Sequence, residues 1–155
     1  MSFGDAIGEC FFNYANFRDR AARAEYWWWV LFSTVLLLVA LVLDFFIFRG
    51  WAVGPFYLVI SLAALLPGLT VTVRRLHDTG RSGWWIMLPI VTGILTVFAS
   101  GYVEATSRGE PTPMELALIG VPALLVLATS ILLFVWMLLP SNPGNNRYGP
   151  NRYTR

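Results

Sequence analysis

Four long apolar runs dominate the pattern of hydrophobic and polar positions along this chain. They cover approximately residues 26–48, 52–74, 84–103 and 116–139. Each has roughly the 20 residues that a helix needs to cross a ~30 Å hydrocarbon core at about 1.5 Å per residue. The pattern therefore predicts an all-α polytopic membrane protein, a four-transmembrane-helix bundle in which residues 1–155 form a single membrane domain.

Tryptophans and arginines lie near the ends of these runs. Tryptophan is enriched at membrane–water interfaces, and cytoplasmic loops carry an excess of basic residues. Two arginines, Arg49 and Arg108, lie in the loops after the first and third runs, against nine elsewhere. This bias predicts that segment 1–25, the second loop and the tail 140–155 are cytoplasmic. The nine arginines are Arg18, Arg20, Arg23, Arg74, Arg75, Arg81, Arg147, Arg152 and Arg155, and the tryptophans are Trp27, Trp28, Trp29, Trp51, Trp84, Trp85 and Trp136.

Two segments outside the runs have patterns of their own. Before the first run, apolar residues recur at steps of three and four, which predicts a short amphipathic helix. It could lie on the inner leaflet or pack against the bundle, and the two are not exclusive. The tail is rich in glycine and proline, which excludes a helix and favours a docked, turn-rich strap over a disordered end. The apolar stripe is Phe3, Ile7, Phe11, Tyr14 and Phe17, and the tail repeats Asn146-Arg147-Tyr148 as Asn151-Arg152-Tyr153.

Composition agrees with lipid as the surrounding medium. The chain is 57% hydrophobic and 15% aromatic but only 13% charged, about half the charged share of a soluble domain. The net charge of +2 is carried by arginines at the edges of the runs, so we expect a membrane surface rather than nucleic acid as the basic residues' partner. The single cysteine, Cys10, excludes an internal disulfide.

Asp44 and Pro67 interrupt the first two runs. Asp44 lies about one turn from the outer end of its run, where we expect Arg49 to pair with it. A proton-relay role is the alternative, because ionisable residues within a membrane often serve function. Pro67 should kink the second span and free a backbone carbonyl near residue 63, and a gating hinge is the alternative to a purely structural kink.

The loop from Arg74 to Trp85 holds the densest polar chemistry. If the second helix continues to Asp78, Arg74 and Asp78 are spaced i,i+4 and can pair. An arginine guanidinium group can donate two parallel hydrogen bonds to phosphate oxygens, and a histidine can add another. The N–H groups of glycines can form an anion-binding nest beside them. Alternatively, the arginines only enforce topology. The predicted anion site combines Arg20, Arg23, Arg74, Arg75, His77, Asp78, Arg81, Ser82 and Arg147.

Three polar segments together carry a family resemblance. The residues are Asn13, Tyr14, Phe17, Arg20, Arg23, Glu25, Tyr26 and Trp27, then Arg74 to Asp78 with Gly80, Ser82, Gly83, Trp84 and Trp85, and more loosely Asn146 to Gly149. With these the chain resembles the bacterial family catalogued as domain of unknown function 805, the YhaH-like inner-membrane proteins. Asp19 departs from the glycine of the family's first motif. The resemblance implies a small multi-span inner-membrane protein whose biochemical role is unassigned.

Several functions fit these patterns. The leading hypothesis is that the cytoplasmic arginines bind a phosphate-bearing ligand, above all a phospholipid head group, so membrane lipids are the expected partners. A small transporter or channel subunit using Asp44 and Pro67 is an alternative, as is a subunit that binds a protein partner or a second copy of itself. We do not expect an enzyme, a metal or another cofactor, because His77 and Asp78 point apart on a helix and no catalytic or metal-binding motif is present.

Overall fold

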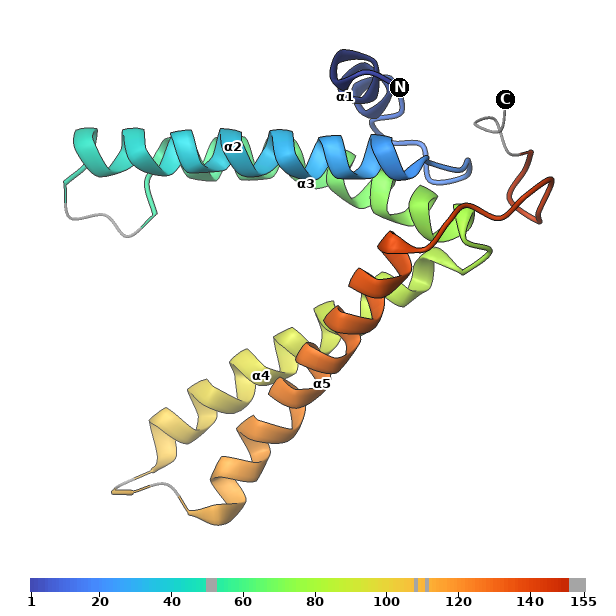
Figure 1. Cartoon of the computed structure of the whole chain (residues 1–155). Coiled ribbons are helices and arrows are strands. Elements are labelled where there is room, and N and C mark those ends of the chain that lie inside the picture. Colours follow the sequence, from blue (N-terminus) through green and yellow to red (C-terminus); the bar gives the residue numbers. More distant parts are fainter. Residues whose placement is uncertain (50–52, 108, 111, 151–155) are drawn as a thin grey trace. The chain divides into compact units, whose positions relative to one another are not determined.

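The computed structural model describes the chain except residues 50–52, 108, 111 and 151–155, and the described part is helical without a β-strand. Within this part, α2, α3, α5 and the continuous stretch of η1 and α4 are long and apolar enough to span a membrane. The predicted all-α, four-span fold is confirmed. The elements are α1 (Phe3–Phe12), α2 (Arg23–Ile47), α3 (Pro55–Asp78), the 3₁₀ turn η1 (Gly83–Ile86), α4 (Met87–Thr106) and α5 (Pro113–Leu138) (Figure 1).

Some sequence predictions concern residues outside the described part. These are Trp51, Arg108, Arg155 and the tripeptide Asn151-Arg152-Tyr153.

The helices extend beyond the ends of the apolar runs. The first span begins at Arg23 instead of residue 26, and the second ends at Asp78 instead of residue 74. Hydropathy marks where the chain leaves the hydrocarbon, whereas helical hydrogen bonding continues into the polar interface. As a result, Glu25, Arg74 and Asp78 are held on helices.

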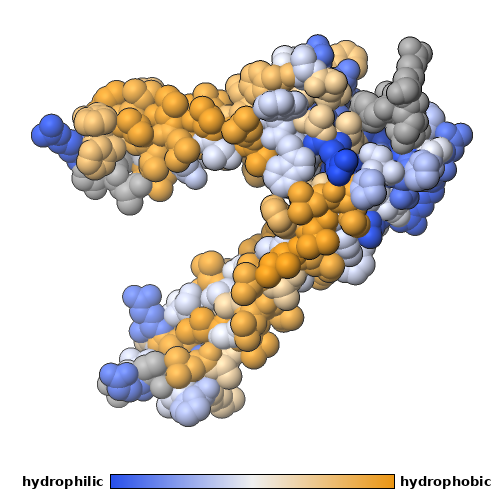
Figure 2. Space-filling model, viewed as in Figure 1, coloured by the Kyte–Doolittle hydropathy of each residue, from blue (hydrophilic) through white to orange (hydrophobic). Residues whose placement is uncertain are grey.

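The chain forms two compact units. Unit one contains Met1–Gly83 and Leu139–Arg155, and unit two contains Trp84–Leu138. In unit two, α4 and α5 pack together as a hairpin, and Trp85 meets Trp136 edge-on with ring centroids 5.2 Å apart. Apolar side chains cover the exposed faces of the helices in both units, as expected for surfaces in contact with lipid (Figure 2).

The N-terminal amphipathic helix is shorter than predicted. Ser2 and Asp5 form a capping box at its start, and the helix ends at Phe12. At that end the Asn13 side chain donates to the carbonyl and carboxylate of Glu9, which provides an alternative to a further helical turn. Tyr14 therefore lies beyond the helix, as does Phe17, and extending the stripe to them was wrong.

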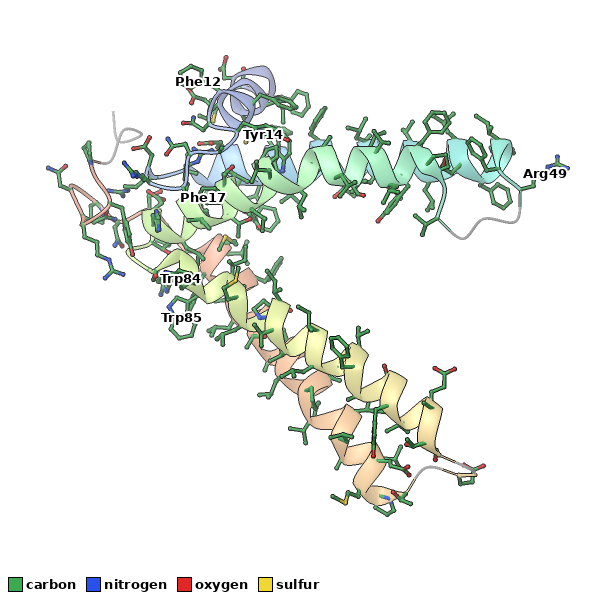
Figure 3. The ribbon with its side chains drawn as sticks, turned by 180° about the vertical axis from the view of Figure 1, so that it is seen from behind. Phe12, Tyr14, Phe17, Arg49, Trp84 and Trp85 are labelled. Carbon is green, nitrogen blue, oxygen red and sulfur yellow. The ribbon has the colours of Figure 1, made fainter. Side chains whose placement is uncertain are left out.

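One side of α1 packs against the α2–α3 hairpin. Ala6 and Cys10 are fully buried there, and the Phe11 ring meets Trp29 edge-on with centroids 5.5 Å apart. The opposite side carries Phe12, which is 88% exposed and points away from the hairpin (Figure 3). The packed alternative for this helix is thus confirmed, and contact of its other face with a leaflet stays a prediction.

Asp44 caps the next helix instead of pairing with Arg49. Its carboxylate accepts hydrogen bonds from the backbone N–H groups of Phe56 (3.1 Å) and Tyr57 (2.7 Å) in the first turn of α3. Exposed helix N-terminal amides attract negative charge, and Gly54 permits the close approach because a Cβ there would overlap Asp44. Arg49 lies at the hairpin's far end and points away from the helices (Figure 3). The expected pair was wrong because the nearby amides compete for the carboxylate.

Pro67 lies within α3, which continues through it. Because proline has no N–H, the carbonyl four residues earlier, that of Ala63, loses its helical donor. The Tyr14 hydroxyl donates to this Ala63 carbonyl at 3.3 Å. The predicted free carbonyl is thus confirmed, and it anchors the segment that follows α1 to α3.

Candidate functional site

Three segments distant in the sequence meet at the polar end of unit one: the residues before α2, the end of α3 and the C-terminal tail. At their centre lies the buried ion cluster, which we define as Arg20, Glu25, Arg74, Arg75 and Asp78. Each of these residues is at most 4% exposed. Charges this deeply buried are unfavourable unless they are paired and hydrogen-bonded.

Asp78 neutralises two arginines at once. Arg20 donates through Nε to Oδ1 at 3.0 Å, and Arg75 donates to the other carboxylate oxygen. The predicted partner, Arg74, is not the one observed. Positions i+3 and i+4 lie on the same side of a helix, so spacing alone could not choose between Arg74 and Arg75.

Arg74 instead pairs with Glu25 on the neighbouring helix α2, with Nη2 and Oε1 2.6 Å apart. The pair is fully enclosed, and the Cys10 sulfur lies 3.9 Å from the same carboxylate oxygen. Burial, and secondarily the charge of Glu25, raises the pKa of the Cys10 thiol to about 12. The thiol is therefore protonated and shielded in the folded protein.

The tail is docked onto this cluster by backbone carbonyls. Arg20 donates from Nη2 to Asn142 O at 2.7 Å and from Nη1 to Gly144 O at 2.8 Å, and Arg75 donates to Leu139 O. The named cluster has three guanidinium groups and two carboxylates, so the carbonyls supply the remaining acceptors. The predicted docked strap is confirmed for the described part of the tail, up to residue 150.

His77 is enclosed by the tail. Its ring stacks on Tyr148 with centroids 3.7 Å apart and planes within 5°, and its Nδ1 lies 3.3 Å from Asp19 O. The Asn146 side chain donates to the His77 carbonyl at 2.9 Å. The histidine thus joins two segments of the chain, and it is only 8% exposed.

Other predicted site residues lie around this cluster. Arg23 and Arg147 are exposed, and Arg81 and Ser82 are half-buried. Arg147 lies over the Tyr148 ring at 4.7 Å, and Arg81 donates to Thr79 O at 3.2 Å. We call Arg23, Arg81 and Arg147 the rim arginines. They differ from the buried arginines in that solvent can reach their side chains.

The predicted anion site thus separates into two layers. The structure joins Arg20, Arg75 and Asp78 directly, places His77 beside them, and turns Arg74 toward Glu25. Sequence reasoning gave Glu25 no partner and missed the side chains of Asn146 and Tyr148 as contacts. The tripeptide that contains both was the available signal, but its docking position depends on long-range contacts.

Comparison with known proteins identifies the relatives of this chain. The model of the family described as "Protein of unknown function (DUF805)" matches residues 14–150. Inner membrane protein YhaH of Escherichia coli K12 is 37% identical over 83 residues, which is 51% of this chain and 67% of that protein. Inner membrane protein YhaI of the same strain is 35% identical over 97 residues, 61% of this chain and 80% of that protein. No solved structure matches the chain significantly.

Proposed function

This chain belongs to the DUF805 family, and from the arrangement of its charges we propose that it binds anionic phospholipid head groups through its rim arginines. The chain is a membrane protein, and its relatives are inner-membrane proteins. In this proposal the polar end of unit one faces the cytoplasm, as the excess of arginines there favours. Phosphate then meets Arg23, Arg81 and Arg147 at the level of the inner-leaflet head groups.

The division of the arginines into two layers carries this proposal. Arg20, Arg74 and Arg75 already have carboxylate or carbonyl partners, and their burial gives a head group no access. The rim arginines surround them at the surface, where guanidinium groups can bind phosphate. Basic residues next to a membrane attract anionic lipids by about 1 kcal/mol each.

Native mass spectrometry from mild detergent tests the proposal. Wild type should retain phosphatidylglycerol over phosphatidylcholine of the same chains, and the triple variant R23A/R81A/R147A should lose most of that preference. R49A is the matched control, since it removes an exposed arginine from the other end of the hairpin. Unchanged head-group preference in the triple variant, with Cys10 still protected from thiol reagents, would refute the proposal.

Transport has weaker support. Both Asp44 oxygens already accept backbone N–H groups. Several hydroxyls within the spans donate to carbonyls of their own helix, which leaves few groups to line a polar path; examples are Ser33, Ser61, Thr72, Thr92, Thr96, Ser100 and Thr129. We therefore place lipid binding ahead of conduction.

A further inference from the structure

The N-terminal segment covers part of the α2–α3 hairpin, since Tyr14 contacts Ala63 and Thr70 of α3. Side chains of α2 and α3 also line an open groove of about 320 Å³. Among its lining residues are Tyr26, Trp29, Ser33, Ser61, Gly68 and Thr72.

The groove has the length of one leaflet. The helix rises about 16 Å from Ser61 to Thr72, at about 1.5 Å per residue. This is about half of a ~30 Å hydrocarbon core. The groove begins at the polar end of the unit, where Tyr26 follows the rim residue Arg23 by one helical turn, and it runs toward the middle of the membrane. One acyl chain of a phospholipid would extend over this distance.

The walls of the groove offer little to a polar ligand. Its hydroxyls donate to the backbone of their own helices: Ser33 to Trp29 O at 2.8 Å, Ser61 to Leu58 O at 2.9 Å and Thr72 to Gly68 O at 2.6 Å. With these donors occupied, the remaining surface is largely aliphatic and aromatic. An apolar chain is the matching occupant.

Trp29 adds a single specific polar group. The residue is 3% exposed, and its ring packs against Phe11 and Phe32. Across the part of the chain that the structure describes, its indole N–H donates to no oxygen. Gly68 leaves this group uncovered, since the indole nitrogen is the atom nearest to the place that a Cβ on Gly68 would occupy, at 3.4 Å. An unmet donor in apolar surroundings is unfavourable, so the site favours a ligand with an acceptor here.

We propose that the groove binds one acyl chain of a diacyl phospholipid, whose ester carbonyl accepts a hydrogen bond from the Trp29 indole N–H. Trp29 lies six residues, about 9 Å along the helix, from Arg23 at the rim. The ester is the part of the lipid that lies between the phosphate and the chain. A second transmembrane helix is a poorer occupant, because its carbonyls are already used by its own hydrogen bonds.

This inference deepens the proposed function. It rests on the proposed function for binding of the lipid head group, but not for binding of the acyl chain. The two can be tested separately, because one concerns the phosphate and the other the ester linkage. We would compare phosphatidylglycerol with ester-linked chains against its ether-linked analogue of the same chain length. Competition between them, read by native mass spectrometry, holds the head group constant and removes only the carbonyl acceptor.

Wild type should retain the ester lipid about threefold better than the ether lipid, as one hydrogen bond provides. W29F keeps a packed ring without the N–H, and it should bind both lipids equally. G68L should lose both lipids, because its side chain fills the groove. G120L is the control, since a Cβ there meets nothing within 4 Å. Protection of Cys10 from thiol reagents verifies folding of unit one in each variant.

Equal retention of the two lipids by wild type, or an ester preference that persists in W29F, would overturn the proposal. A protein that carries no lipid but changes from dimer to monomer in G68L would assign the groove to a second copy, and this too would overturn it. If R23A/R81A/R147A loses head-group preference but keeps the ester preference, both proposals stand. If it keeps head-group preference while the ester preference behaves as expected, only the proposed function fails.

Discussion

Asp78→Asn removes the carboxylate that neutralises two buried arginines. The substitution preserves the size of the side chain but leaves Arg20 and Arg75, at 4% and 0% exposure, without a carboxylate between them. It also replaces one acceptor oxygen by an NH₂ group that faces guanidinium donors. We expect the variant to be strongly destabilised.

The expected loss is at least about 3 kcal/mol in the free energy of unfolding. Removing one partner from a buried ion pair costs about 3–5 kcal/mol, because the remaining charge is left uncompensated. Here one carboxylate serves two cations, which raises the cost. The carbonyls of Leu139, Asn142 and Gly144 still accept from the arginines and limit it.

Cys10 provides the assay. Its thiol is fully buried, with a pKa raised to about 12, so thiol reagents should modify it only when unit one opens. The rate of modification, measured in mild detergent over a denaturant series, gives the free energy of opening for wild type and variant. Glu104→Gln is the control, because Glu104 is an exposed carboxylate on α4, far from Cys10 in the sequence.

A double variant refines this test. Arg20→Met with Asp78→Asn removes one of the two uncompensated cations, so it should be less destabilised than the sum of the single changes. If Asp78→Asn opened as rarely as Glu104→Gln, the carbonyls alone would suffice for both arginines. The assignment of Asp78 as their neutralising partner would then be wrong.

Three further outcomes follow from the fold. Tyr14→Phe should cost about 1 kcal/mol of unfolding free energy in the same thiol assay. The loss should be much smaller in a Pro67→Ala background, because the restored N–H of residue 67 then donates to the Ala63 carbonyl. An equal loss in both backgrounds would contradict this. Gly54→Ala should cost about 1–3 kcal/mol, because its Cβ would overlap the Asp44 side chain; wild-type stability in a denaturant titration would show that the cap can shift. Because the folded pKa of Cys10 is raised, the unfolded state loses the thiol proton first. The thiol's contribution to stability should therefore be full below about pH 9 and fall by up to about 1.4 kcal/mol per pH unit between pH 9 and 12. Cys10→Ala should make the measured fall shallower, and a Cys10→Ala profile identical to that of wild type would refute the raised thiol pKa.

Features that depend on residues close together in the sequence could be predicted, whereas contacts between residues distant in the sequence could not. The spans depend on how many apolar residues occur in succession, which the sequence displays directly, and so all four were found. The carbonyl freed by Pro67 is equally local, because the missing donor is always four residues away. Its partner, Tyr14, is 49 positions distant and could not be derived from spacing.

The predicted partners of the charged residues were wrong for a related reason. For Asp44, Arg49 is close in sequence, but the amides at the start of α3 are brought beside it by the hairpin turn. For Asp78, two arginines one position apart were both within reach, and the packing of Glu25 against Arg74 decided between them. The partner of a charged residue at the end of a span can therefore be assigned only when the position of the neighbouring helix is known.

This dependence on neighbouring helices changes how the arginines should be interpreted. Positive-inside topology requires only that arginines be present, whereas Arg20, Arg74 and Arg75 are buried among specific partners from three segments. A lysine at position 20 could not donate to Asp78, Asn142 and Gly144 in the same fixed fork. Arg20→Lys retains the charge that sets topology and should still loosen the tail. At the rim, where only charge near phosphate is needed, Arg23→Lys should be tolerated, and this contrast separates the structural arginines from those proposed to bind lipid.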